Sequence, residues 1–177
     1  MKLTEYENFY HVDISTQIDN KWKNDSVLAI VKGSERYSIK IKARDKEEIK
    51  RRFIIGNKGR SEKRHNKKIV AIVYSYLLYK SLSNFKEANP LLLCRDVRPE
   101  RAVMHFLRRI ARFLGNPSIL NREIKFRKKV EFETEEKLPK SLAGKYAKKV
   151  YQGKIESVKI IDKHETGELI EIIGKIS

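Results

Sequence analysis

The first third of the chain shows an alternation of apolar and polar residues that predicts β-strands. Over residues 10–15 every second residue is apolar, which is the period of a strand with one buried face and places Asp13 on the polar face. The apolar run 27–31 and the alternating segment 37–41 are separated by a Lys-Gly-Ser turn, which is typical of a β-hairpin. We therefore expect the chain to open with three strands.

Charge order and apolar spacing predict helices in the middle of the chain. Residues 45–54 begin with acidic and end with basic side chains, the order that a helix dipole favours. The apolar run from Ile69 to Leu82 is interrupted by polar residues and is shorter than a membrane span, so it predicts a buried helix, over about residues 67–84. From Pro99 to Leu114 apolar residues recur with helical spacing, and Gly115 ends the helix.

The remaining apolar segments are short and predict strands, one helix and a closing hairpin. Residues 91–94 indicate a buried strand, although periodicity does not distinguish it from a helical turn. Alternation predicts a strand over 124–132, and a short basic helix is expected over 144–151. Apolar runs at 158–161 and 169–173 flank a Glu-Thr-Gly turn, which predicts a hairpin at the end of the chain.

The order of these elements predicts a single domain, residues 1–177, of the α/β or α+β class, with a mixed central sheet and flanking helices. A chain of 177 residues has the size of one ordinary domain, and it shows no internal repeat. Residues 56–68 carry six Lys or Arg against one acid and are expected to form a mobile basic loop. Residues 134–143 are the best candidate for a surface connection.

The balance of charges indicates a polyanionic partner. The chain has 40 Lys and Arg against 23 Asp and Glu, a formal net charge of +17 that exceeds what solubility requires. Nucleic acid, either DNA or RNA, is the commonest such partner. A membrane-binding protein would carry a basic amphipathic terminal helix, and none stands out, so no membrane partner is expected. An adaptor for an acidic protein is a third alternative.

Composition also bears on compartment and cofactors. No signal-peptide pattern is visible, which predicts an intracellular, cytoplasmic protein. A single cysteine, Cys94, excludes a disulfide within the chain and a cysteine-based zinc cluster. No nucleotide-binding glycine loop is present, so no organic cofactor is expected. Abundant Lys, Ile and Glu with only two Gln is typical of thermophile proteins, although AT-rich genomes produce a similar bias.

Two basic regions are candidate contacts for nucleic acid, since each Lys or Arg that neutralises a phosphate releases a counterion on binding. On the predicted helix after Pro99, Arg101, His105, Arg108 and Arg112 recur at i, i+4, i+7 and i+11, which stacks them in one row. The alternative is a solvated surface of a protein with excess charge. The second region is the basic loop and its surroundings, with the candidate contacts Lys58, Arg60, Lys63, Arg64, Lys67, Lys68 and Arg98.

Three carboxylates are candidate catalytic residues and metal ligands. Asp13 lies on the first predicted strand, Glu48 on the first helix, and Asp96 after the short buried strand. Mg²⁺ and Mn²⁺ prefer oxygen ligands, and two such ions can activate a water and stabilise the leaving oxygen in phosphodiester cleavage. Each acid also has an ordinary explanation: Asp96 as a helix cap, Glu48 as a partner of Arg51 or Arg52, and Asp13 as an exposed strand residue.

The order of three strands, an acidic helix, a strand followed by Asp96 and a further helix resembles the ribonuclease H-like superfamily over about residues 5–114. The resemblance implies a mixed central sheet flanked by helices and two-metal nuclease chemistry. Asp13 would match the first-strand aspartate of the superfamily, Glu48 its first-helix glutamate and Asp96 its second-strand aspartate. The basic loop and the long helix after Glu48 are additions to that pattern.

The last part of the chain departs from the superfamily pattern. The pattern expects a final carboxylate on a late helix, but Asp162, Glu165 and Glu168 fall on the predicted hairpin. We therefore expect a nucleic-acid-binding protein. The more specific hypothesis is a Mg- or Mn-dependent nuclease of ribonuclease H-like architecture. The alternative is a non-catalytic binder or an accessory subunit of a nucleoprotein complex, in which the acids belong to the scaffold.

Overall fold

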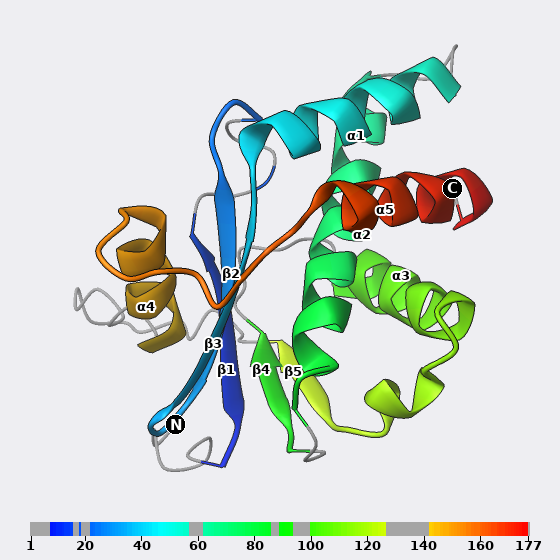
Figure 1. Ribbon diagram of the computed structural model, residues 1–177. Helices are drawn as coiled ribbons and strands as arrows, with labels where there is room; N and C mark the ends of the chain where they lie inside the picture. Colours follow the sequence, from blue (N-terminus) through cyan, green and yellow to red (C-terminus); the bar gives the residue numbers. More distant parts are fainter. Residues whose placement is uncertain are drawn as a thin grey trace, which may run out of the picture.

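The computed structural model describes residues 8–15, 18, 22–56, 62–85, 89–93, 100–126 and 142–176. These residues form one domain with a mixed six-stranded β-sheet and five α-helices (Figure 1). The mixed sheet with flanking helices is thus confirmed, and of the two predicted classes the fold is α/β. The finer expectation of a ribonuclease H-like architecture stays a prediction.

The sheet has the strand order β5-β4-β1-β2-β3-β6. Its first part is an antiparallel meander of the three strands predicted from the sequence: β1 (Tyr10–Ser15), β2 (Ser26–Lys32) and β3 (Glu35–Ile41). The other strands are shorter and add in parallel, β4 beside β1, β5 beside β4 and β6 beside β3: β4 (Leu91–Leu93), β5 (Ile124–Phe126) and β6 (Lys159–Ile160). Segments far apart in the sequence therefore meet at both edges of the meander.

The tight turn between β2 and β3 explains the glycine in the predicted hairpin. Lys32 pairs with Glu35, so only two residues, Gly33 and Ser34, form the loop. Gly33 has a φ of 56°, in the left-handed region where a β-carbon would be strained.

The two faces of the sheet belong to different hydrophobic cores. On β1, Val12 and Ile14 lie in the larger core, whereas Asp13 points to the other face, directly across from Ala29 of β2. Ala29 belongs to the smaller core. β2 is buried on both faces, which explains why its sequence is a continuous apolar run rather than an alternating one.

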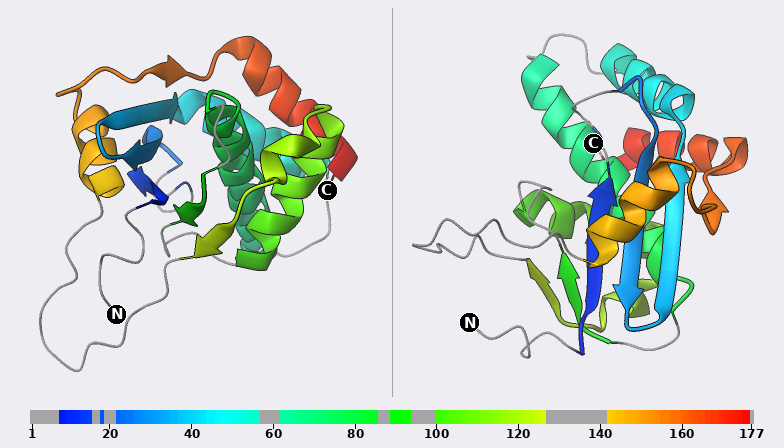
Figure 2. Two further views of the ribbon diagram at one scale, coloured as in Figure 1. Left: turned by 90° about the horizontal axis from the view of Figure 1, so that it is seen from below. Right: turned by 90° about the vertical axis from the view of Figure 1, so that its left-hand side faces the viewer.

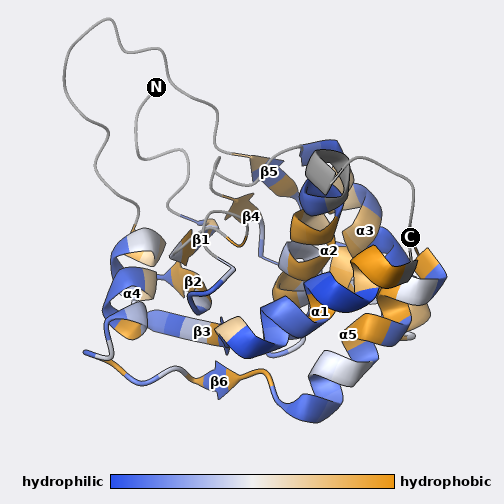
Figure 3. Ribbon diagram, turned by 90° about the horizontal axis from the view of Figure 1, so that it is seen from above, coloured by the Kyte–Doolittle hydropathy of each residue, from blue (hydrophilic) through white to orange (hydrophobic). Residues whose placement is uncertain are grey.

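Four helices cover the face of the larger core, and one covers the other face (Figures 1 and 2). The first group is α1 (Ala43–Gly56), α2 (Glu62–Leu82), α3 (Glu100–Phe113) and α5 (Lys163–Ile176), and the helix on the opposite face is α4 (Leu142–Tyr151). α2 is the centre of the large core, since residues 71–79 are all buried and it packs against the other three helices. Polar and apolar segments alternate around α1, α4 and α5 in Figure 3, as expected of helices buried on one side.

The prediction of a basic loop over residues 56–68 is wrong for residues 62–68. Residues 62–68 form the first turns of α2, and Gly56 is the last residue of α1. Lys and Arg have good helix propensity, and the apolar run from Ile69 onwards anchors the same helix in the core. Residues 57–61 lie outside the described part of the chain.

The predicted C-terminal hairpin is also wrong, since only Lys159 and Ile160 form a strand and α5 follows. The start of α5 is a reciprocal cap. Asp162 Oδ1 accepts a hydrogen bond from the Glu165 N–H at 2.8 Å, and Glu165 Oε2 accepts one from the Asp162 N–H at 3.3 Å. The apolar run after this cap has helical spacing, and its buried residues are Leu169, Ile172, Ile173 and Ile176.

Two further predicted segments are only partly described. Of the strand expected over 124–132, residues 124–126 form β5 and the rest lies outside the described residues. The surface connection expected over 134–143 falls outside them up to residue 141, and residues 142 and 143 already belong to α4.

Candidate nucleic-acid interface

The row of basic residues predicted on one helix lies on the exposed side of α3. The buried side of this helix carries Val103, Phe106, Leu107, Ile110 and Ala111. The opposite side is exposed to solvent and carries Arg101, His105, Arg108 and Arg112, which we call the arginine row. The predicted separation of an apolar stripe from a basic row is thus confirmed. Phe113, one of the apolar residues that recur with helical spacing between Pro99 and Leu114, is nevertheless 40% exposed, with the Lys175 ammonium 4.8 Å from its ring centroid.

The positive charges of the arginine row are not neutralised by neighbouring acids. Within the described residues, Arg101, Arg108 and Arg112 make no ion pair or hydrogen bond through their guanidinium groups. Glu100 is the one acid in the α3 sequence. Arg109, also exposed and without an ion pair among these residues, flanks the row. Four guanidinium groups on one helix are therefore free to bind phosphate, for which their planar fork is well suited.

The other predicted basic contacts are only partly described. Lys67 is exposed and Lys68 half-buried near the start of α2. Lys63 and Arg64 belong to the same helix, but their side chains are outside the description, as are Lys58, Arg60 and Arg98. Their role as nucleic-acid contacts stays a prediction.

Asp13 lies on the sheet face that α4 covers. It is half-buried on β1, and its Oδ1 accepts a hydrogen bond from the Ile14 N–H at 2.8 Å. α4 packs against β1 and β2 on this face. Asp13 is therefore partly covered by the packing of α4 on the sheet and is less exposed than the strand residue that its ordinary explanation predicted.

Glu48 lies on α1, which packs on the other face of the sheet, and is held by two arginines of its own helix. Arg51 donates to its carboxylate at 2.7 Å and Arg52 at 2.8 Å. Hydrogen bonds from Arg52 and then Arg51 lower the pKa of Glu48 below its usual value. The carboxylate is thus ionised, and its negative charge is balanced by the two arginines, as the ordinary explanation of this residue predicted.

Asp96 lies outside the described residues, so the proposed set of three ligands is incomplete here. β4, which ends at Leu93, runs parallel to β1, and Leu93 pairs with Val12. Among the residues that the structure describes, no group of three or more His, Cys, Asp or Glu side chains could hold a metal ion. The metal site stays a prediction that depends on Asp96.

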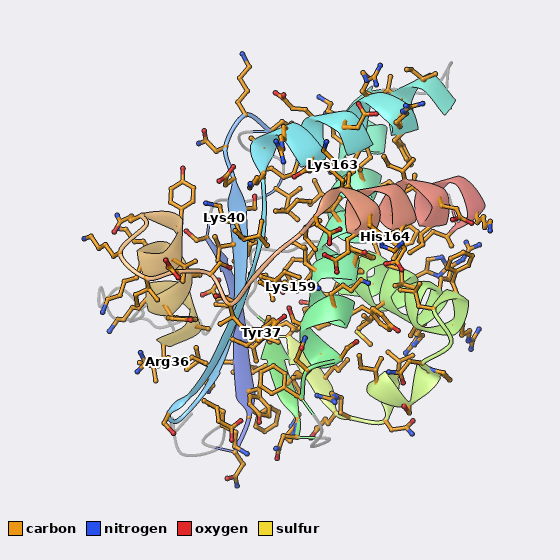
Figure 4. All side chains as sticks on the ribbon, viewed as in Figure 1. Arg36, Tyr37, Lys40, Lys159, Lys163 and His164 are labelled. Carbon is orange, nitrogen blue, oxygen red and sulfur yellow. The ribbon has the colours of Figure 1, made fainter. Side chains whose placement is uncertain are left out.

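The acids near the end of the chain serve the packing of α5. Glu165 is buried, and its Oε1 lies 3.6 Å from Lys80 Nζ and 2.8 Å from the Nζ of Lys159, which is labelled in Figure 4. Glu168 binds Lys80 at 2.8 Å and accepts a hydrogen bond from the Tyr76 hydroxyl at 2.5 Å. Burial raises the pKa of Glu168, but Lys80 and Tyr76 outweigh it, so the pKa lies below its usual value. These acids join α5 to α2 and β6.

The structure also reveals basic residues that the candidate site had not included. Lys145, Lys148 and Lys149 are exposed on α4, and no acidic residue occurs in this helix. The signal was present in the sequence as a basic segment at helical spacing. The sequence alone did not show that this helix covers the sheet face of Asp13.

Comparisons with known proteins found no relationship: no family model matches the chain, and no curated protein or solved structure matches it either. In the described ranges, none of the helices is both long and apolar enough to cross a bilayer. The functional conclusions therefore come from the residues themselves.

Proposed function

We propose that this chain binds nucleic acid through the arginine row of α3. The observation that carries the proposal is the exposed set of arginines without acidic partners among the described residues, on a chain with a net charge of +17. Guanidinium groups spaced along one side of a helix can bind the repeated phosphates of a nucleic-acid backbone. Release of condensed counterions then supplies the free energy of binding.

The proposal predicts a steep dependence of affinity on salt. Binding of fluorescently labelled single- and double-stranded DNA and RNA is measured by anisotropy at increasing KCl concentration. For a duplex, log K should fall linearly with log salt, by about 0.9 per phosphate contacted. An affinity that does not change with salt for any of these ligands would contradict nucleic-acid binding.

The arginine row is tested by the triple variant Arg101→Gln, Arg108→Gln and Arg112→Gln. If each side chain contacts one phosphate, the slope of log K against log salt should become shallower by about two to three. These side chains are exposed, so the fold should not change.

The matched control removes the same number of positive charges from side chains that already have acidic partners. Arg51 pairs with Glu48 at 2.7 Å, Lys125 with Glu123 at 3.0 Å and Lys175 with Glu171 at 2.6 Å. Replacing these three cations with Gln should change the slope much less. If the slope became shallower by the same amount in the two triple variants, only net charge would matter, and the arginine row would not be the interface.

A metal-dependent nuclease is the second candidate, and the position of β4 favours it. β4 lies beside β1 and parallel to it, so the strand that carries Asp13 neighbours the strand that leads to Asp96. Two carboxylates from adjacent parallel strands can share a divalent ion. The order of elements also supports the resemblance to the ribonuclease H-like superfamily.

Two observations place the nuclease second to simple binding. Glu48, the proposed first-helix ligand, is already neutralised by Arg51 and Arg52. Of the two late helices, α4 packs on the strand of Asp13 but has no acidic residue, and in α5 Glu165 and Glu168 already pair with Lys159 and Lys80. A complete two-metal site would require ligands other than these.

A further inference from the structure

A second basic surface lies on α4, on the opposite face of the sheet from α3. Ala143, Tyr146, Ala147 and Val150 bury one side of α4 against the sheet. Lys145, Lys148 and Lys149 lie at i, i+3 and i+4 and are exposed on the other side, so they form one group, which we call the lysine face.

The positive charges of the lysine face, like those of the arginine row, are not paired with acidic side chains of the described residues. Within the described residues none of its three ammonium groups makes an ion pair or hydrogen bond. A further cation lies beside the helix, because the Arg36 guanidinium of β3 is 5.9 Å from the centroid of the Tyr146 ring (Figure 4). This surface therefore offers phosphate the same kind of contact as α3.

The arrangement of layers separates the two basic surfaces. α4 covers one face of the sheet, and α3 packs on α2 over the other face (Figures 1 and 2). The exposed sides of α3 and α4 are thus turned away from each other, with the sheet and α2 between them. A duplex has a persistence length of about 150 base pairs, so a short duplex cannot bend around this one domain to contact both surfaces.

We infer that the arginine row and the lysine face bind two separate double-stranded nucleic-acid segments, so that one molecule of the protein bridges two duplexes. The inference rests on the proposed function, because it assigns phosphate binding to both surfaces. The net charge of +17 offsets the repulsion between the two duplexes that are brought together.

A co-retention experiment tests the inference. A DNA duplex of about 20 base pairs, too short to bend around the protein, is fixed to beads and saturated with protein. A second, fluorescent duplex of the same length is added, and the retained fluorescence is measured. Anisotropy with the fluorescent duplex alone measures binding separately. Melting curves confirm that each variant is folded.

The informative variant is Lys145→Gln, Lys148→Gln and Lys149→Gln, and its control is the triple variant of the paired cations Arg51, Lys125 and Lys175. Because the arginine row remains, the lysine-face variant should bind the single duplex within about 10-fold of the native protein while its co-retention falls to background. The control should still retain the second duplex.

The possible failures are distinguishable. Native protein that binds one duplex but does not retain the second would overturn the bridging inference and leave the proposed function in place. Undiminished co-retention by the lysine-face variant would also overturn it, since bridging would then come from another surface or from association of protein molecules. Absence of binding in the anisotropy experiment would overturn duplex binding and bridging together.

Discussion

Replacing Glu165 with glutamine is expected to lower the free energy of unfolding by roughly 2 kcal/mol at neutral pH. The side chain is only 7% exposed and lies between the ammonium groups of Lys159 and Lys80. The hydrogen bond with the Glu165 carboxylate favours the charged form of Lys159 and raises the pKa of this lysine above its usual value. Glutamine keeps the size of the side chain and still caps α5, but it removes the countercharge.

The expected loss is smaller than the roughly 3–5 kcal/mol of a fully buried broken pair. Lys159 is 39% exposed, so water can solvate it, and Lys80 retains its ion pair with Glu168. Glu171→Gln on the same helix is the control, because its pair with Lys175 is exposed on both sides. That change should cost less than about 0.5 kcal/mol.

Urea unfolding followed by circular dichroism measures both variants. A clearly larger loss for Glu165→Gln than for Glu171→Gln is expected. Equal midpoints for the two variants would mean that the buried acid does not stabilise the attachment of α5 to α2 and β6.

Local patterns predicted those elements whose burial is one-sided. Residues of β1 alternate between core and opposite face, and α3 separates its apolar and basic sides, so the periods of the sequence correspond to the structure. The same regularity placed Asp13 on the face away from the large core and the arginine row on the surface. For these features the local sequence contains all the information required.

α5 shows where a local pattern misleads. The Glu-Thr-Gly segment between two apolar runs resembles a turn, but a glycine such as Gly167 is tolerated within a helix. The decisive signal is the spacing of Asp162 and Glu165, which form a reciprocal cap. The run after this cap contacts α1, α2 and α3, and only this packing selects helix over strand.

The rest of the candidate site depends on contacts between distant segments. The pairing of Lys80 with Glu168 and the position of α4 over β1 join residues far apart in the sequence. Neither contact has a signature in composition or spacing. The pairing of Glu48 with Arg51 and Arg52 could be predicted from their helical spacing. The position of the α4 lysines on the sheet face of Asp13 could be found only from the fold.

Any Mg²⁺- or Mn²⁺-dependent cleavage of nucleic acid by this chain is expected to fall by more than about 100-fold when Asp13 is replaced with asparagine. Removal of an outer partner of a metal site costs about 10- to 100-fold, and loss of a charged ligand should cost more. Asp13 is the described candidate acid on the strand adjacent to β4. A time course with single- and double-stranded DNA, RNA and hybrid, with metal or EDTA, measures the effect.

The controls separate loss of a ligand from loss of charge or of fold. Glu156→Gln removes an exposed acid that has no ion pair among the described residues and should leave cleavage unchanged. Asp13→Asn should bind nucleic acid in EDTA at least as tightly as the native chain, because one negative charge is gone. Full cleavage by Asp13→Asn would show that the catalytic centre does not include Asp13. A native chain that binds all four substrates and cleaves none would leave binding as its activity, as the neutralised Glu48 and the lysines of α4 lead us to expect.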